Sequence, residues 1–158
     1  MEASVYQRMK RNYDTHWWGR ARREILSDVL ATWMKDGGKA RIIEIGAGTG
    51  ANVSFLSAFG TVTTVEMDAA ARSVIAEDHP NVVIRAGALP DPAFFDGETF
   101  DAAVMFDVLE HVAEEAEALD VIRAHVVPGG QLFVSVPAYQ WLWGHHDERV
   151  HHQRRYSR

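Results

Sequence analysis

The chain of 158 residues is long enough for one domain with a sizeable core, and its 47% hydrophobic and 24% charged residues are ordinary for a globular domain. The net charge of −6 argues against nucleic acid as a partner, because nucleic-acid binding depends largely on neutralising phosphates. No apolar run is long enough to span a membrane, the N-terminus lacks the apolar core of a secretory signal, and cysteine is absent, so we expect a cytoplasmic chain without disulfides.

Short runs rich in β-branched residues alternate with helical patterns through the middle of the chain. An apolar stripe at helical spacing predicts a helix over residues 21–34, ahead of the first strand. The strands are predicted at 41–45, 61–66, 82–85, 101–106 and 131–136, and the helices between them at 51–59, 69–77 and 112–126. Regular alternation of strand and helix implies βαβ units, so we predict an α/β fold with a doubly wound, mainly parallel sheet.

A glycine-rich turn, Glu44-Ile45-Gly46-Ala47-Gly48-Thr49-Gly50, follows the first predicted strand. Gly46 and Gly48 have no Cβ, so a ligand can approach the backbone closely, and the unpaired N–H groups that open the next helix point at it. Glu66 ends the second strand, twenty residues after Gly46, where a carboxylate can accept both hydroxyls of a ribose. The pattern therefore indicates a nucleoside-containing cofactor at the ends of the first two strands.

The turn alone leaves the identity of this cofactor open. Gly46, Gly48 and Ala51 also fit the dinucleotide pattern, so an NAD(P)-dependent oxidoreductase fragment is one alternative. Glu44 favours a different cofactor, because its carboxylate can hold the ammonium group of an amino-acid-like ligand at a position where nicotinamide proteins usually have an apolar residue. A non-catalytic, truncated cofactor-binding domain is the second alternative.

Several motifs together resemble the class I S-adenosylmethionine-dependent methyltransferases. The motifs are residues 44–50, Glu66, the run Phe106-Asp107-Val108-Leu109-Glu110-His111-Val112, and Pro128-Gly129-Gly130, which is predicted as a turn before the fifth strand. Residues 16–23 and 143–156 resemble one branch that acts on small molecules. The resemblance implies a Rossmann-like sheet, S-adenosylmethionine as cofactor with S-adenosylhomocysteine as product, and methyl transfer to a small-molecule acceptor that the sequence does not identify.

The resemblance also implies roles for individual residues in binding the cofactor. The implied contacts are Glu44, Gly46, Ala47, Gly48 and Gly50 for the methionine part, Glu66 for the ribose, Met67, Gly87, Ala88 and Leu89 for the adenine, and Asp107 and Val108 for the sulfonium end. Many members of the family have an Asp in the adenine loop, whereas the nearest one here is Asp91. Tyr13 and Trp18, in the front segment, are further candidates to close over the cofactor.

A general base is needed only if the methyl acceptor must lose a proton. His111 is our candidate for this catalytic role, and His145, His146, His151 and His152 are other histidines that we considered. The spacing of these histidines matches no metal-ligand motif, so we expect no bound metal.

The resemblance divides the chain into three parts. These are an N-terminal helical cap segment over residues 1–40, the cofactor-binding core over 41–137, and a substrate-side loop over 138–158. Class I methyltransferases have two further strands after the fifth, and neither is found in this sequence. We therefore expect the fifth strand to form an apolar sheet edge, and we favour a chain that is part of a longer enzyme over a homodimer through that edge.

Overall fold

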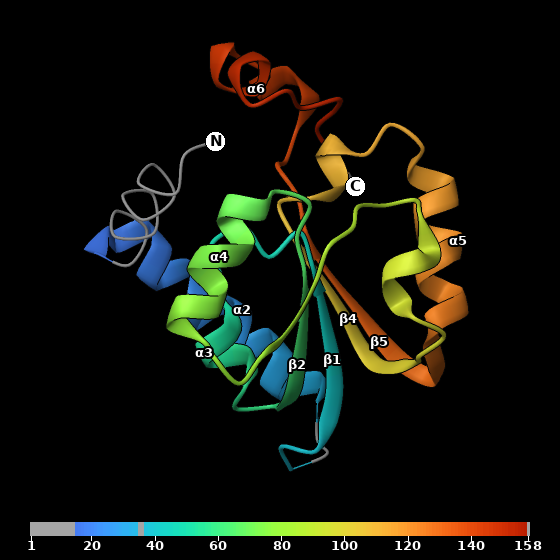
Figure 1. Cartoon of the computed structure of the whole chain (residues 1–158). Helices are drawn as coiled ribbons and strands as arrows, with labels where there is room; N and C mark the ends of the chain where they lie inside the picture. Colours follow the sequence, from blue (N-terminus) through green and yellow to red (C-terminus); the bar gives the residue numbers. More distant parts are fainter. Residues whose placement is uncertain (1–14, 35–36, 158) are drawn as a thin grey trace.

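The computed structural model describes residues 15–34 and 37–157. A sheet of five parallel strands forms its centre, in the order β3-β2-β1-β4-β5 (Figure 1). The strands are β1 (Ala40–Ile45), β2 (Gly60–Val65), β3 (Val83–Arg85), β4 (Phe100–Phe106) and β5 (Val126–Ser135). The prediction of a doubly wound α/β fold is confirmed. Because β4 pairs with β1 rather than with β3, the chain reverses its direction across the sheet between β1 and β4, where ligands of such folds bind.

Helices cover both faces of the sheet. The α-helices are α2 (Trp17–Trp33), α3 (Val53–Leu56), α4 (Ala69–Asp78), α5 (Glu115–His125) and α6 (His145–Arg149), and the 3₁₀ helices are η1 (Pro92–Phe95), η2 (Leu109–His111) and η3 (Gln140–Leu142). In Figure 1, α2 and α3 lie on one side of the sheet, α5 lies on the other, and α6 lies beyond the carboxyl ends of the strands.

Two apolar clusters fill the space between the sheet and its helices. Side chains of a strand point alternately to its two faces, so Ile42 of β1 belongs to one cluster, whereas Ile43 and Ile45 belong to the other. Leu30 of α2 packs in the first cluster and Ile122 of α5 in the second. Both faces of β1 are therefore buried, as expected for a central parallel strand.

The first helix differs from its prediction. It begins four residues earlier, because the side chain of His16 caps it by accepting a hydrogen bond from the backbone N–H of Trp18. Leu30 is buried, but Ile25 and Trp33 of the predicted apolar stripe are exposed, so only part of the stripe faces the core. Among the described residues, no helix combines the length and the apolar character needed to cross a lipid bilayer.

Three other elements differ from their predicted bounds by more than one residue. The helix after the glycine turn, α3, has only four residues, and α5 begins three residues later than predicted because η2 precedes it. The predicted turn at Pro128-Gly129-Gly130 is wrong, since β5 runs through these residues. They form an irregularity, at which the pairing with β4 shifts from Phe100↔Val126 to Ala102↔Gln131.

Candidate functional site

A cavity of about 470 Å³ opens at the carboxyl ends of β1, β2 and β4. The residues predicted for the site that line it are Gly46, Glu66, Met67, Gly87, Ala88, Leu89, Asp107, Val108 and His111. The remaining wall consists of Ile45, Val112, Ala113 and Glu114, to which the sequence analysis assigned no role in binding. The strand order therefore brings the glycine turn, the acid after β2, the loop after β3 and the motif after β4 to one cavity.

Gly46 allows the turn after β1 to pack against the loop after β4. Its φ is +73°, and a Cβ at this position would lie 2.5 Å from Cγ2 of Val108. The backbone N–H groups of Gly46 and Ala47 both donate to the carbonyl of Val65, at 2.8 and 3.0 Å, and so tie the turn to the end of β2. Gly48 differs, because a Cβ there would meet open space. The turn thus requires glycine at position 46 for both steric and conformational reasons.

The carboxylate of Glu66 is held by two backbone donors. The N–H of Gly48 donates to Oε2 at 2.8 Å, and the N–H of Asp68 donates to Oε1 at 2.9 Å. Glu66 is buried, with 9% of its surface exposed, and it lines the cavity. Each carboxylate oxygen has two lone pairs, so both oxygens keep the capacity to accept one more hydrogen bond.

Glu44 is fully buried beneath the glycine turn and does not line the cavity. Asn52 donates from Nδ2 to its Oε1 at 2.7 Å, while Oε2 has no hydrogen-bond partner among the described residues. Burial raises the pKa of Glu44 to about 7, although the hydrogen bond from Asn52 and the charge of Arg22 act in the opposite direction. Ala47, Gly48 and Gly50 likewise lie outside the cavity wall.

Asp107 connects the site to the first helix. Its φ is +57°, and its carboxylate forms an ion pair with Arg22 of α2 at 2.7 Å and accepts from Oγ of Ser135 at 3.2 Å. Arg22 also donates to Oγ of Ser135 at 2.6 Å. The end of β4, the end of β5 and α2 are therefore joined by one polar network, in which Arg22 is a residue that the sequence did not indicate.

Of the two aromatic residues that were predicted to close over the cofactor, the structure describes only one. Tyr13 lies outside the described residues. Trp18 is on α2, is 55% exposed and does not line the cavity. Of the apolar residues predicted for the adenine, Met67 is exposed at the mouth of the cavity, and Leu89 packs against the core.

His111 lies on the wall of the cavity at the end of η2. Although the residue is partly exposed, desolvation by the cavity wall lowers its pKa, and the neighbouring His152, whose ring centroid is 4.8 Å away, lowers it further. The preceding residue, Glu110, is 1% exposed, and neither oxygen of its carboxylate has a hydrogen-bond partner among the described residues. Burial raises the pKa of Glu110.

The segment that follows α6 folds back onto this corner of the molecule. Asp147 of α6 is fully buried and accepts from Nε and Nη2 of Arg155, at 2.7 and 2.9 Å, and from Nδ1 of His152 at 2.8 Å. These donors hold the pKa of Asp147 well below its usual range, with the hydrogen bonds from Arg155 as the largest cause. The backbone N–H of Gln153 donates to the carbonyl of Glu110 at 2.7 Å.

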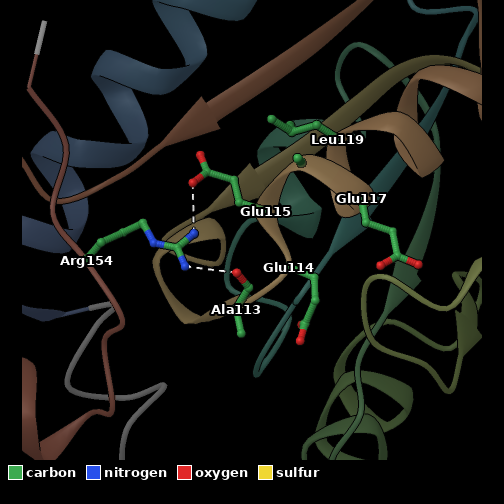
Figure 2. A pocket seen from close by; sticks show the side chains of 7 residues that line it. Ala113, Glu114, Glu115, Glu117, Leu119 and Arg154 are labelled. Carbon is green, nitrogen blue, oxygen red and sulfur yellow. Dashed lines mark hydrogen bonds and ion pairs between the residues drawn. The ribbon is translucent and has the colours of Figure 1, made fainter.

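A second, larger hollow of about 650 Å³ lies beside the start of α5 (Figure 2). Arg154 crosses it and donates to Oε2 of Glu115 at 2.8 Å and to the carbonyl of Ala113 at 3.1 Å. No strand end contributes to its lining, so size alone does not make it the cofactor site. Ala113 and Glu114 line both hollows, which therefore adjoin each other.

The chain is an α/β domain with a cavity at the point where the strand order reverses, which is where ligands of such folds bind. A family model described as a methyltransferase domain matches residues 17–158, and the chain belongs to this family. Membership confirms the resemblance found in the sequence and disfavours the oxidoreductase alternative. A search of curated proteins finds no match.

Solved structures of methyltransferases share the fold. The amino pentose methyltransferase CalS10 of Micromonospora echinaspora, solved with S-adenosylmethionine bound, is 26% identical, with a TM-score of 0.64 over 85% of this chain and 60% of that one. DesVI of Streptomyces venezuelae is 18% identical, with a TM-score of 0.69 over 84% of this chain and 58% of that one. The DhpI complex with S-adenosylhomocysteine is 22% identical, with a TM-score of 0.62 over 86% and 68%. This chain thus spans about three fifths of the length of DesVI and CalS10.

Proposed function

We propose that the chain is an S-adenosylmethionine-dependent methyltransferase domain that transfers a methyl group to a small-molecule acceptor. The observation that carries the proposal is the cavity at the carboxyl ends of β1, β2 and β4, where Gly46, Glu66 and the loop 87–89 meet. Membership of the methyltransferase-domain family supports the activity, and CalS10 with S-adenosylmethionine bound supports the cofactor.

The residues of the cavity fit this cofactor. Glu66 has two free acceptor positions for the ribose hydroxyls, while Met67 and the loop 87–89 offer an apolar and backbone surface for the adenine. Asp107 and Val108 would lie toward the sulfonium end, and the unpaired Oε2 of Glu44 would attract the ammonium group through the turn. When bound, the cofactor supplies an electrophilic methyl group, and the walls of the cavity orient it and exclude water.

His111 is proposed as the group that accepts a proton from an acceptor hydroxyl or ammonium. It lies on the cavity wall near Asp107 and Val108, and its lowered pKa keeps the imidazole neutral at pH 7, the form that accepts a proton. The adjoining hollow next to Glu114 extends the space on this side of the cavity, and we propose that the acceptor enters there.

Calorimetric titration of the chain tests the cofactor. We expect S-adenosylhomocysteine to bind one to one and NAD not to bind. Binding of NAD without binding of S-adenosylhomocysteine would reverse the assignment, and binding of neither would favour a domain without a cofactor.

Glu66→Gln tests the residue on which the ribose contact depends. The substitution keeps the shape but removes the charge, so we expect the dissociation constant of S-adenosylhomocysteine to rise about tenfold, the effect of one charge-assisted hydrogen bond. Asp120→Asn on the exposed face of α5 is the matched control and should leave binding unchanged. Equal affinities of the Glu66 variant and the control for S-adenosylhomocysteine would show that Glu66 does not bind the ribose.

We also propose where the chain is located and what it binds. The absence of cysteine is compatible with the cytoplasmic location that we propose. The net charge of −6 supports a chain that does not bind nucleic acid. β5 lies at the edge of the sheet with Leu132 and Val134 more than a third exposed, which supports both the longer enzyme that we favour and the alternative, association of two copies through this strand. A mass measured in solution over a range of concentrations tests it, and a monomer throughout would contradict it.

A further inference from the structure

The buried carboxylate of Glu110 has no hydrogen-bonding partner that the described residues supply. The side chain is 1% exposed, and no other residue in the described part of the chain donates a hydrogen bond to Oε1 or Oε2. A buried ionisable group without a partner is costly, and native structures nearly always satisfy it with a protein group, an ordered water or an ion. The surroundings of Glu110 therefore indicate which of these is present.

His152 presents a ring nitrogen to this carboxylate. Its Nδ1 lies 2.8 Å from Oδ1 of Asp147, and a carboxylate at that distance only accepts, so we assign the hydrogen to Nδ1 and the lone pair to Nε2. Nε2 is 3.9 Å from Oε1 of Glu110. This separation is too long for a hydrogen bond, but two metal–ligand bonds of about 2.0–2.1 Å span it.

His111 completes a set of three possible ligands. One ligand atom each from Glu110, His111 and His152 can be chosen so that all lie within 4.8 Å of one another. Two zinc–ligand bonds reach at most about 4.2 Å, so these side chains must move slightly closer together when they bind one ion. The rings of His111 and His152 meet edge to face, with an interplanar angle of 74°, so they do not stack against each other. His111 is also a wall residue of the cofactor cavity, which gives this set access to the cavity.

We propose that Glu110, His111 and His152 bind a divalent transition-metal ion of the zinc class. Two imidazoles and one carboxylate form the ligand set of catalytic zinc sites, which leave a further position open. Imidazole nitrogen disfavours Mg²⁺ and Ca²⁺, which prefer oxygen ligands.

Asp147 supports the proposed site from behind. It orients the ring of His152 through Nδ1, as carboxylates do behind metal-bound histidines, and is itself fixed by Arg155 and by the backbone N–H of Gly144 at 2.9 Å. In the metal-bound chain, His111 would bind the ion and would not act as the base. The ion would instead lower the pKa of the hydroxyl group of the methyl acceptor and so favour its deprotonation. That use rests on the proposed methyl transfer, whereas the metal site itself does not.

Metal titration of the full chain tests the site. The chain is stripped with a chelator and titrated with ZnCl₂ by calorimetry and with CoCl₂ by visible absorption, both without S-adenosylhomocysteine. We expect one ion per chain and the absorption bands of a four- or five-coordinate Co²⁺. His111→Ala and Glu110→Gln should each weaken Zn²⁺ binding at least about tenfold. His145→Ala, which removes an exposed histidine of α6 outside the set, is the control and should leave the affinity unchanged.

The outcomes separate this inference from the proposed function. Absence of stoichiometric Zn²⁺ binding, or equal affinities of the parent chain and the His111→Ala variant, would overturn the metal site. Because the side chain of His111 is exposed, this variant remains informative even if Glu110→Gln does not fold. Binding of S-adenosylhomocysteine is measured in parallel on the metal-free chain. If that binding persists while Zn²⁺ binding is absent, only the metal site is overturned.

Discussion

Gly46 illustrates how a single residue sets the shape of the site. Its positive φ disfavours any side chain, and the two γ-methyl groups of Val108 occupy the place that a Cβ would take. Gly48 shares the positive φ but faces open space. At Gly48 only the backbone conformation disfavours a side chain, whereas at Gly46 both the conformation and the contact with Val108 do.

We expect Gly46→Ala to destabilise the fold more than Gly48→Ala. The conformational cost, about 1 kcal/mol, applies to both, whereas the contact with a stiff valine adds about 1–3 kcal/mol at position 46 only. Urea unfolding of the two variants measures the difference. Adding Val108→Ala should make Gly46→Ala less damaging than it is in the parent chain, and equal losses at positions 46 and 48 would contradict the packing that we describe.

Glu44 makes the stability of the fold depend on pH. Its folded pKa of about 7 lies above the ordinary value of 4.5, so the fold favours the protonated form. The stabilisation is present below pH 4.5 and is lost as pH rises through about 7, a change on the order of 3 kcal/mol. Glu44→Gln, which cannot ionise, should lack this loss. Unfolding measured at pH 5 and pH 8 tests this, and parallel pH profiles of the two proteins would rule it out.

The residues that were predictable lie where a motif follows a strand. Gly46, Glu66 and Asp107 combine recognisable chemistry with a position at a strand end, and parallel strands bring such positions together. Ile45 and Val112 have no chemical signature beyond being apolar. Glu110 and His152 are far apart in the sequence, and no spacing rule links residues that meet only when the segment after α6 folds back.

At the scale of elements, α2 is attached to the sheet by Arg22 as well as by apolar packing. Arg22 reaches Asp107 and Ser135 at the ends of β4 and β5, and its guanidinium lies 5.7 Å from the centre of the Phe106 ring. The helix therefore borders the end of the sheet where the cavity lies, and we expect this attachment to limit its motion.

Arg22→Ala should loosen α2 with a modest loss of stability. The carboxylate of Asp107 is 55% exposed, so solvent weakens the ion pair and we expect a loss of about 1 kcal/mol. Hydrogen exchange of the α2 amides should become faster, while exchange in β1 should not change. Arg20→Ala, on the same helix, is the control. If both variants exchange alike, Arg22 does not fasten the helix.

The predicted elements were most accurate in the centre of the sheet and least accurate at its periphery. The β-branched run of β1 is buried on both faces, so pattern and structure agree there to within one residue. β5 was predicted to start after Pro128-Gly129-Gly130, because these residues usually form turns, but the strand begins at Val126 and contains them as an irregularity between the pairs Phe100↔Val126 and Ala102↔Gln131. The short helix η2 delays the start of α5, and its sequence has no signal that distinguishes a 3₁₀ turn from the first turn of an α-helix.

For the whole molecule, the strand order determines which sequence motifs meet at the cavity. The order β3-β2-β1-β4-β5 places β1 at the centre of the sheet, and it brings the glycine turn, Glu66, the loop after β3 and the motif after β4 to the wall of one cavity. The corner formed by η2 and the segment after α6 adjoins this cavity through His111. The sites proposed for the cofactor, the acceptor and the metal therefore all lie at one end of the sheet.

The most direct measurement is a crystal structure of the chain with S-adenosylhomocysteine. We predict the ligand in the cavity at the ends of β1, β2 and β4, with its ribose hydroxyls on the carboxylate of Glu66 and its adenine beside the loop 87–89. Density for the ligand only in the hollow beside α5, or a Glu66 side chain directed into solvent with the cavity closed by neighbouring side chains, would contradict the account.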